Sequence, residues 1–186
     1  MKSNNLKTYL NSKKCFKLIC GAGNKNFNEI TNLCALYADA GCKFFDVNPS
    51  MEAVRAAKTG IKCANKEDCF ICVSVGADKD PHMSKCRINN KKCISCKNCL
   101  KSCLQKAIIF ESGEIHIDKN KCIGCRRCIS KCLKDAIESY SDNISLSELL
   151  PPIIREGIDC IEYHAITDDL NEVMADCEII TKLFKG

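Results

Sequence analysis

The chain has 186 residues, 46% of them hydrophobic, and a formal net charge of +5, so it can bury one or two modest cores. Its 18 cysteines are about a tenth of the sequence, a proportion that otherwise marks secreted disulfide scaffolds. Because residues 1–7 lead into no apolar stretch long enough for a signal peptide or a membrane span, we expect a cytoplasmic protein with reduced thiols.

The first part of the chain alternates short apolar runs with segments of helical periodicity, which predicts three strand–helix units. The expected strands cover residues 16–20, 43–47 and 70–75. The first helix is expected to begin at Asn26 and to end at Gly41. The second is expected to follow an Asn48 cap, to cover residues 50–58 and to end before Gly60.

The middle of the chain holds two cysteine runs with identical spacing. Each reads C-x2-C-x2-C-x3-C, the spacing of bacterial ferredoxins that bind [4Fe–4S] clusters. The runs are Cys93, Cys96, Cys99 and Cys103, then Cys122, Cys125, Cys128 and Cys132. Neighbouring residues match as well in CISCKNCLKSCLQKAI and CIGCRRCISKCLKDAI, the second of which begins 29 residues after the first. An internal duplication therefore predicts a two-cluster, ferredoxin-like α+β domain.

The spacing also predicts which cysteines share a cluster. Three thiolates two residues apart can surround one cube, whereas the fourth begins a helix, points away and ligates the other cube in two-cluster ferredoxins. We expect two [4Fe–4S] clusters, one bound by Cys93, Cys96, Cys99 and Cys132, and the other by Cys122, Cys125, Cys128 and Cys103. Between the runs, residues 107–117 read as a hairpin with its turn at Ser112-Gly113, which we expect to shield the clusters on one side.

Zinc is the main alternative metal, but structural zinc sites use two C-x2-C pairs instead of four cysteines in unbroken 2-2-3 spacing.

The segment that holds the two cysteine runs is basic, with eleven Lys or Arg against four acidic residues between Lys91 and Asp135. Compensation of two anionic clusters, each about −2 with its thiolates, explains this excess best. A docking face for an acidic redox partner is the alternative. Nucleic acid is not expected, because no aromatic residues interleave with the lysines.

The last part of the chain returns to the strand–helix pattern. Ser145-x-x-Glu148 opens a helix that Gly157 ends. Residues 160–164 read as a fourth strand, and residues 171–184 read as the last helix.

Four such units around an insert predict an α/β fold. A (β/α)8 barrel uses eight units in about 250 residues, so we expect a half barrel into which the ferredoxin-like domain is inserted. The expected parts are units 1–3 in residues 15–77, the cluster domain in 78–143, and the remaining helix, strand and helix in 144–186. The two open strand edges of a half barrel must be covered or paired. Three alternatives follow: the chain forms a homo-oligomer, it is the front part of a longer ancestral barrel, or the fold is a smaller open sheet.

Several segments outside the runs carry a resemblance to a known family. The chain is similar to the cyanobacterial light-dependent period protein LdpA family in FKLICGAG, NLCALYADAGCKFFDVN, SVGAD before DPHMSK, and IDCIEYHA. The resemblance covers residues 15–186 and implies an iron–sulfur protein linked to redox input into the circadian clock, in a family whose members extend past the end of this chain. The chain departs from the family at Leu104 and Leu133, where proline usually follows the fourth cysteine.

The resemblance adds a possible second site. In barrel folds, side chains at the C-terminal ends of strands line the active face. The residues at those positions match the family: Cys20, Asp46, Asn48, Ser74, Glu162 and His164. In the alternative interpretation, Asn48 caps a helix, Asp46 accepts loop hydrogen bonds and His164 lies at the surface.

Ten cysteines lie outside the runs. Five occupy apolar-periodic positions and are expected to be small core residues: Cys34, Cys42, Cys72, Cys160 and Cys177. A third metal site at Cys63, Cys69 and Cys72 is not expected, because Cys69 and Cys72 would point to opposite faces of a strand.

These patterns predict an iron–sulfur protein with two clusters that acts in intracellular electron transfer or redox sensing and has a redox partner protein. The alternative is a flavin-type barrel oxidoreductase, represented by its cluster-containing subunit or by a truncated form. A non-catalytic role is favoured, because half a barrel lacks the later loops that usually hold phosphate groups.

Overall fold

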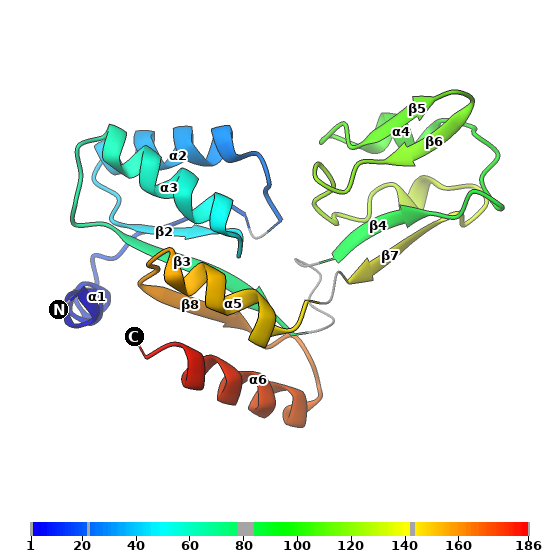
Figure 1. Cartoon of the computed structure of the whole chain (residues 1–186). Helices are drawn as coiled ribbons and strands as arrows, with labels where there is room; N and C mark the ends of the chain where they lie inside the picture. Colours follow the sequence, from blue (N-terminus) through cyan, green and yellow to red (C-terminus); the bar gives the residue numbers. More distant parts are fainter. Residues whose placement is uncertain (1, 22, 78–83, 142–143, 186) are drawn as a thin grey trace. The chain divides into compact units, whose positions relative to one another are not determined.

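The computed structural model describes residues 2–21, 23–77, 84–141 and 144–185, and it divides the chain into two compact units. The first unit consists of residues 1–77 and 144–186, and the second consists of residues 78–143. A parallel sheet forms the centre of the first unit, whereas the second contains two antiparallel strand pairs (Figure 1).

The first unit contains a four-stranded parallel sheet with the order β1-β2-β3-β8. Its strands are β1 (Lys17–Ile19), β2 (Phe44–Val47), β3 (Phe70–Gly76) and β8 (Cys160–His164). Each of them lies within a residue or two of an expected strand, so the predicted parallel sheet is confirmed. The register places Asp46 beside Ile19 and Cys72, and it places Ser74 beside Glu162.

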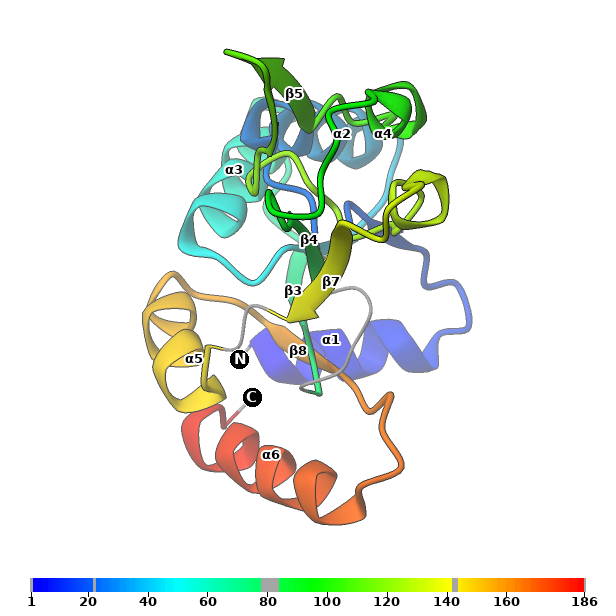
Figure 2. The same cartoon turned by 90° about the vertical axis from the view of Figure 1, so that its right-hand side faces the viewer.

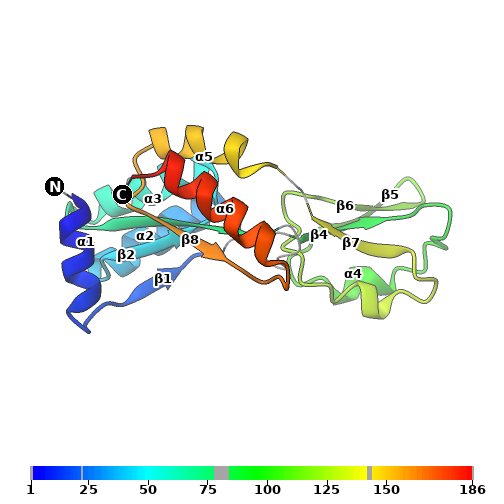
Figure 3. The ribbon, with the colours of Figure 1, turned by 90° about the horizontal axis from the view of Figure 1, so that it is seen from below.

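Helices cover the two faces of this sheet unequally. They are α1 (Lys2–Asn11), α2 (Phe27–Asp39), α3 (Met51–Cys63), α5 (Leu146–Arg155) and α6 (Leu170–Leu183). α2, α3 and α5 pack on one face against Phe45 and Val73 (Figure 2), and α6 packs beside α5 against Tyr163. The sequence pattern did not predict α1, which crosses the opposite face near the strand starts, where Tyr9 stacks on Phe70 (Figure 3). Lys17, Asp46, Ser74 and Glu162 lie on that opposite face as well.

The boundaries of α3 differ from those predicted. Ser50, and not Asn48, caps the helix, because its side chain accepts a hydrogen bond from a backbone N–H of the first turn. The helix then continues past Gly60 instead of ending before it. Gly60 lies where α3 contacts α2, since a Cβ built there would lie only 2.3 Å from the Thr31 carbonyl oxygen. This glycine therefore permits a close approach of two helices.

We expect Gly60→Ala to destabilise the first unit by about 1–3 kcal/mol, the usual cost of overpacking, because the added methyl group meets backbone that cannot move alone. The better helix propensity of alanine, up to about 1 kcal/mol, only partly offsets this cost. Denaturant unfolding followed by circular dichroism measures the difference, with the exposed Lys62→Ala in the same helix as the control. Equal stability of wild type and Gly60→Ala would contradict the close α2–α3 packing.

In its described residues, 84–141, the second unit contains two strand pairs and two short helical turns. β4 (Ser84–Ile88) pairs with β7 (Ile137–Ser141), and β5 (Ile108–Glu111) pairs with β6 (Glu114–Ile117); the helical turns are α4 (Asn98–Ser102) and the 3-10 helix η2 (Ile129–Lys131). The β5–β6 hairpin confirms the predicted one, and its turn residues Ser112 and Gly113 have positive φ. No local pattern predicts the β4–β7 pair, because its strands lie far apart in the chain and no tight turn joins them.

The internal duplication is visible in this unit. A shift of 29 residues places β4 on β6, β5 on β7, and the end of α4 on η2. In each repeat, one strand precedes the cysteine run and another follows it. Both strand pairs join the first strand of one repeat to the last strand of the other, so the two repeats are interlocked.

Candidate cluster sites

The second unit contains two small cavities lined by cysteines. The first brings Cys93, Cys96 and Cys99 of the first run together with Cys132 of the second. Aliphatic and basic side chains complete its wall: Ile88, Ile94, Ile115, Leu133, Ile137, Lys131 and Lys134.

The second cavity has the reciprocal composition. It brings Cys122, Cys125 and Cys128 of the second run together with Cys103 of the first, and it contains a fifth cysteine, Cys86. The rest of its wall is again aliphatic, basic or neutral: Ala107, Ile108, Ile117, Ile123, Gln105, Arg126 and Arg127. Side chains of the β5–β6 hairpin lie in the walls of both cavities.

Left-handed backbone at equivalent positions of the two runs forms the turns that carry these cysteines. Ser95 and Lys97 have φ of +52° and +66°, and their counterparts Gly124 and Arg126 have φ of +67° and +59°. Non-glycine residues adopt this region at a cost, and such strained positions concentrate at functional sites. The same left-handed turn is thus present in both repeats, beside the cysteines in each case, and only Gly124 adopts it without cost.

Backbone N–H groups fix the orientation of several sulfurs. The N–H of Ala107 donates to Cys103 Sγ at 3.3 Å, and the N–H of the equivalent Ala136 donates to Cys132 Sγ at 3.1 Å. Hydrogen bonds to ligand sulfurs are among the features that set the potential of a cluster. The fourth cysteine of each run is therefore held in the same way.

Cys86 has a different electrostatic role from its neighbours in the second cavity. The neighbouring Cys122 and Cys128 side chains, together with burial, raise the pKa of Cys86 well above that of an ordinary thiol. The interaction with Cys86 lowers the pKa of Cys122 and Cys128. Cys86 is therefore held as a neutral thiol beside two of the run cysteines. Sequence reasoning missed Cys86, because it lies outside the runs and reaches the cavity through β4.

The chemistry of both cavities fits an iron–sulfur cube. Each offers four run cysteines as sulfur donors, and the residues that line the two cavities include no histidine and no carboxylate. Thiolates are the usual protein ligands of such clusters. The surrounding aliphatic side chains limit access of water, and the lysines and arginines compensate the negative charge of a thiolate-bound cluster.

The predicted positions of the other cysteines are partly confirmed. Cys34, Cys42 and Cys72 are buried, and Cys160 is half-buried. The prediction for Cys177 is wrong: it is exposed, because α6 buries none of its residues fully and this position faces outward.

The three cysteines considered for a third metal site do not converge. Cys69 lies in the core beneath α2 and α3, Cys72 lies with α1 on the opposite face of the sheet, and Cys63 is exposed.

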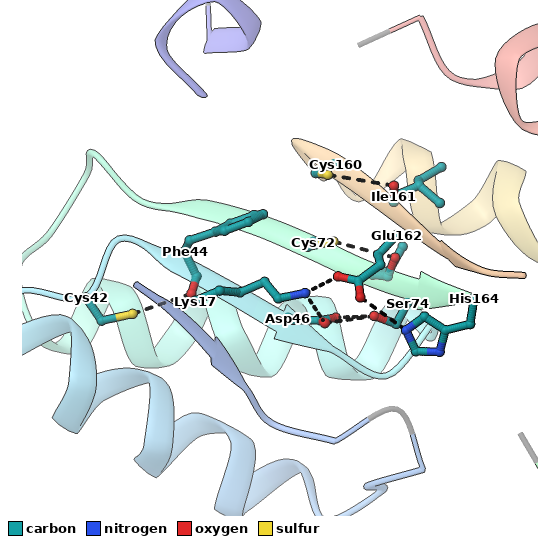
Figure 4. A network of polar contacts seen from close by, with 11 residues as sticks. Lys17, Cys42, Phe44, Asp46, Cys72, Ser74, Cys160, Ile161, Glu162 and His164 are labelled. Carbon is teal, nitrogen blue, oxygen red and sulfur yellow. Dashed lines mark hydrogen bonds and ion pairs between the residues drawn. The ribbon is translucent and has the colours of Figure 1, made fainter. Parts of the chain in front are cut away.

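A polar network lies on the sheet face opposite α2 and α3 (Figure 4). Lys17 Nζ of β1 is 3.1 Å from Asp46 Oδ2 of β2 and forms a second ion pair with Glu162 of β8. Ser74 Oγ of β3 donates to Asp46 Oδ1 at 2.7 Å. His164 Nε2 lies 3.2 Å from Glu162 Oε1. Alternate residues of parallel strands share a face, which is why these side chains meet.

The network is held together by charge. Asp46 is only 3% exposed, so its carboxylate depends on its partners. Burial opposes the charge of Lys17, but hydrogen bonds to Glu162 and Asp46 outweigh it and raise the Lys17 pKa. The hydrogen bond from Lys17 lowers the pKa of Glu162. Asp46, Cys72 and Glu162 have ligand atoms within 4.8 Å of one another, as a metal site would, and the Lys17 ammonium group supplies positive charge between the two carboxylates.

The structure brings four of the six residues considered for a second site into this network, namely Asp46, Ser74, Glu162 and His164. Cys20 instead points into the core, where its sulfur lies 4.0 Å from Cys34 Sγ. Asn48 is buried just after β2. Sequence reasoning missed Lys17, because this residue begins its strand and reaches the network only through its long side chain.

Comparisons with known proteins concern the cysteine-rich unit. No curated protein and no solved structure matches the chain. The similarity to the LdpA family therefore stays a prediction. Residues 78–83, which carry part of that similarity, lie outside the described residues. In the described part of the chain, no helix has the length and apolar character needed to cross a membrane. Residues 92–136 match the family of 4Fe-4S dicluster domains. The chain therefore contains a 4Fe-4S dicluster domain of the ferredoxin type.

Proposed function

We propose that this chain is a cytoplasmic iron–sulfur protein that binds two [4Fe–4S] clusters and transfers electrons. The observation that carries the proposal is the composition of the two cavities, each of which combines three cysteines of one run with the fourth of the other. When bound, such clusters supply one-electron oxidation and reduction. The exchange of the fourth cysteine also keeps the two sites close enough for electrons to pass between them.

The residues of the chain have distinct roles in this proposal. The first cluster would be held by Cys93, Cys96, Cys99 and Cys132, and the second by Cys122, Cys125, Cys128 and Cys103. The N–H groups of Ala107 and Ala136 orient the exchanged cysteines. Basic residues beside the cavities compensate charge, and the exposed ones could also attract an acidic redox partner.

Anaerobic reconstitution tests this proposal. The full chain should bind about eight iron and eight sulfide, the content of two four-iron cubes. Chemical analysis measures both, and the broad absorbance of the clusters should decrease on reduction with dithionite. An iron content near zero together with tightly bound zinc would contradict the proposal.

We further propose that the first unit is half a β/α barrel. In support, the order β1-β2-β3-β8 places each strand beside the one before it in the sheet, and α2, α3 and α5 share one face. The network around Lys17 lies on the other face, which would be the interior of a full barrel. β1 and β8 are the edge strands of the described sheet, and a second copy of the chain would pair with one of these edges.

This polar network favours a second candidate function, a cluster-containing part of a flavin-type barrel oxidoreductase. Barrel enzymes carry catalytic groups at the C-terminal ends of their strands, and Asp46, Glu162 and His164 are ionisable groups on such strands. Flavin at one per chain in the purified protein would favour this function over electron transfer alone. So would an activity that Asp46→Asn or His164→Ala abolishes while both clusters remain.

A further inference from the structure

The two cluster cavities differ by one thiol. The second contains Cys86, which belongs to neither cysteine run and precedes the residues that match the dicluster domain. Cys86 is 2% exposed, and it belongs to one buried cluster with Cys122 and Cys128, with which it lines the cavity. The four ligand positions of this cavity are already filled by run cysteines, so Cys86 is a surplus sulfur packed beside them.

The duplication identifies the residue that stands in its place at the other cavity. β4 and β6 are equivalent strands, and the 29-residue shift places Cys86 on Ile115. Ile115 is also 2% exposed, and it lines the first cavity as Cys86 lines the second. One cavity thus has a hydrogen-bond donor at the position where the other has a hydrocarbon side chain.

We propose that Cys86 is not a ligand but a hydrogen-bond donor to the ligand sulfurs of Cys122 and Cys128, and that it raises the reduction potential of the second cluster. The inference rests on the proposed binding of two clusters. Reduction adds an electron, so the ligand sulfurs of the reduced cluster carry more negative charge than those of the oxidised cluster. A thiol that donates to these sulfurs stabilises the reduced form more, which shifts the potential upward. Ile115 cannot do this, so the two sites are made inequivalent.

Redox titrations monitored by electron paramagnetic resonance test the proposal on the reconstituted full chain. In Cys86→Ala, the midpoint of one cluster should move to more negative potential, while the other midpoint and the iron and sulfide content stay at wild-type values. Cys86→Ser keeps a hydrogen-bond donor, so the midpoint potential of this cluster should stay close to the wild-type value. Ile115→Cys supplies a donor at the other cavity and should move the other midpoint to more positive potential.

Other outcomes would overturn the proposal. Loss of about four iron in Cys86→Ala would show that Cys86 is a ligand. Unchanged midpoints in both Cys86→Ala and Ile115→Cys would show that a thiol at this position does not affect the clusters. Equal shifts of both cluster midpoints in Cys86→Ala would show that the effect is not local. If Cys86→Ala does not fold, Ile115→Cys decides, since an unshifted midpoint there contradicts the mechanism. A wild-type chain without clusters would contradict the proposed function instead.

Discussion

Cys132→Ala should remove the cluster held by Cys93, Cys96 and Cys99, although Cys132 belongs to the other run. The reason is geometric, because the Cys132 side chain lines the cavity of the first run and not that of its own. Without a fourth thiolate the cube loses a ligand, and the iron content should fall from about eight to about four. Cys103→Ala should have the reciprocal effect on the other cluster.

Pairs of substitutions show which cysteines share a cluster by iron analysis alone. Cys96→Ala with Cys132→Ala should leave one cluster intact, because both cysteines line the first cavity. Cys125→Ala with Cys132→Ala should remove both clusters, because these cysteines line different cavities. The reverse result would mean that each run binds its own cluster independently. Cys177→Ala, which changes an exposed cysteine outside both cavities, serves as the control and should retain all the iron.

Lys17→Met should destabilise the first unit by about 3 kcal/mol, at the lower end of the cost of breaking a buried ion pair. The substitution removes the cation between Asp46 and Glu162, and it leaves a carboxylate that is only 3% exposed without its charge partner. The estimate lies at the lower end because Glu162 is partly exposed and water can compensate its charge. Unfolding in denaturant, followed by circular dichroism, measures the loss.

Two further variants separate the contributions to this network. Asp46→Asn added to Lys17→Met should recover much of the lost stability, because it removes the unpaired charge and keeps the side-chain shape. Glu162→Gln alone should cost less than about 1 kcal/mol, as exposed pairs do. If Lys17→Met unfolds at the wild-type denaturant concentration, the buried carboxylate does not depend on Lys17 and the expected role of the ion pair is wrong.

The network should also make stability depend on pH. Lys17 lowers the pKa of Glu162 in the folded protein, so this stabilisation is present above the unfolded pKa of about 4.3 and is lost as the pH falls through the folded value. The pKa of Lys17 is raised, so its contribution is present below about pH 10 and disappears as the pH rises through the folded value. In Lys17→Met, the free energy of unfolding should therefore change less with pH in both the acidic and the alkaline range.

The features that depend on local sequence were predictable. The repeated spacing of the cysteines identified the dicluster domain, because a cube restricts how far apart its ligands can lie. Ser112-Gly113 placed the β5–β6 turn, and Gly41, with φ of +98°, marked the end of the first predicted helix. In each case, a few neighbouring residues determine the backbone conformation.

The features that depend on distant contacts were not predictable. Gly60 reads as the end of a helix, and only the approach of α2 shows why a glycine is needed inside one. Cys86 reaches a cavity of the other repeat because β4 pairs with β7 across the whole unit. Lys17 lies beside Phe44 in the register, and it joins the polar network only because its long side chain reaches along the sheet face to Asp46 and Glu162.

The β4–β7 pair has a consequence for the folding kinetics of the parallel sheet. β3 and β8 are neighbours in that sheet, but the entire second unit separates them in the chain. The entropy lost in closing a loop grows with its flexible length, and such non-local pairings slow folding. The register of β4 and β7 places Ser84 beside Ser141, so the folded insert begins and ends at adjacent points. Once it has folded, α5 and the segments beside it are the main part of the connection left to close between β3 and β8, so we expect closure of the sheet to be faster after that step.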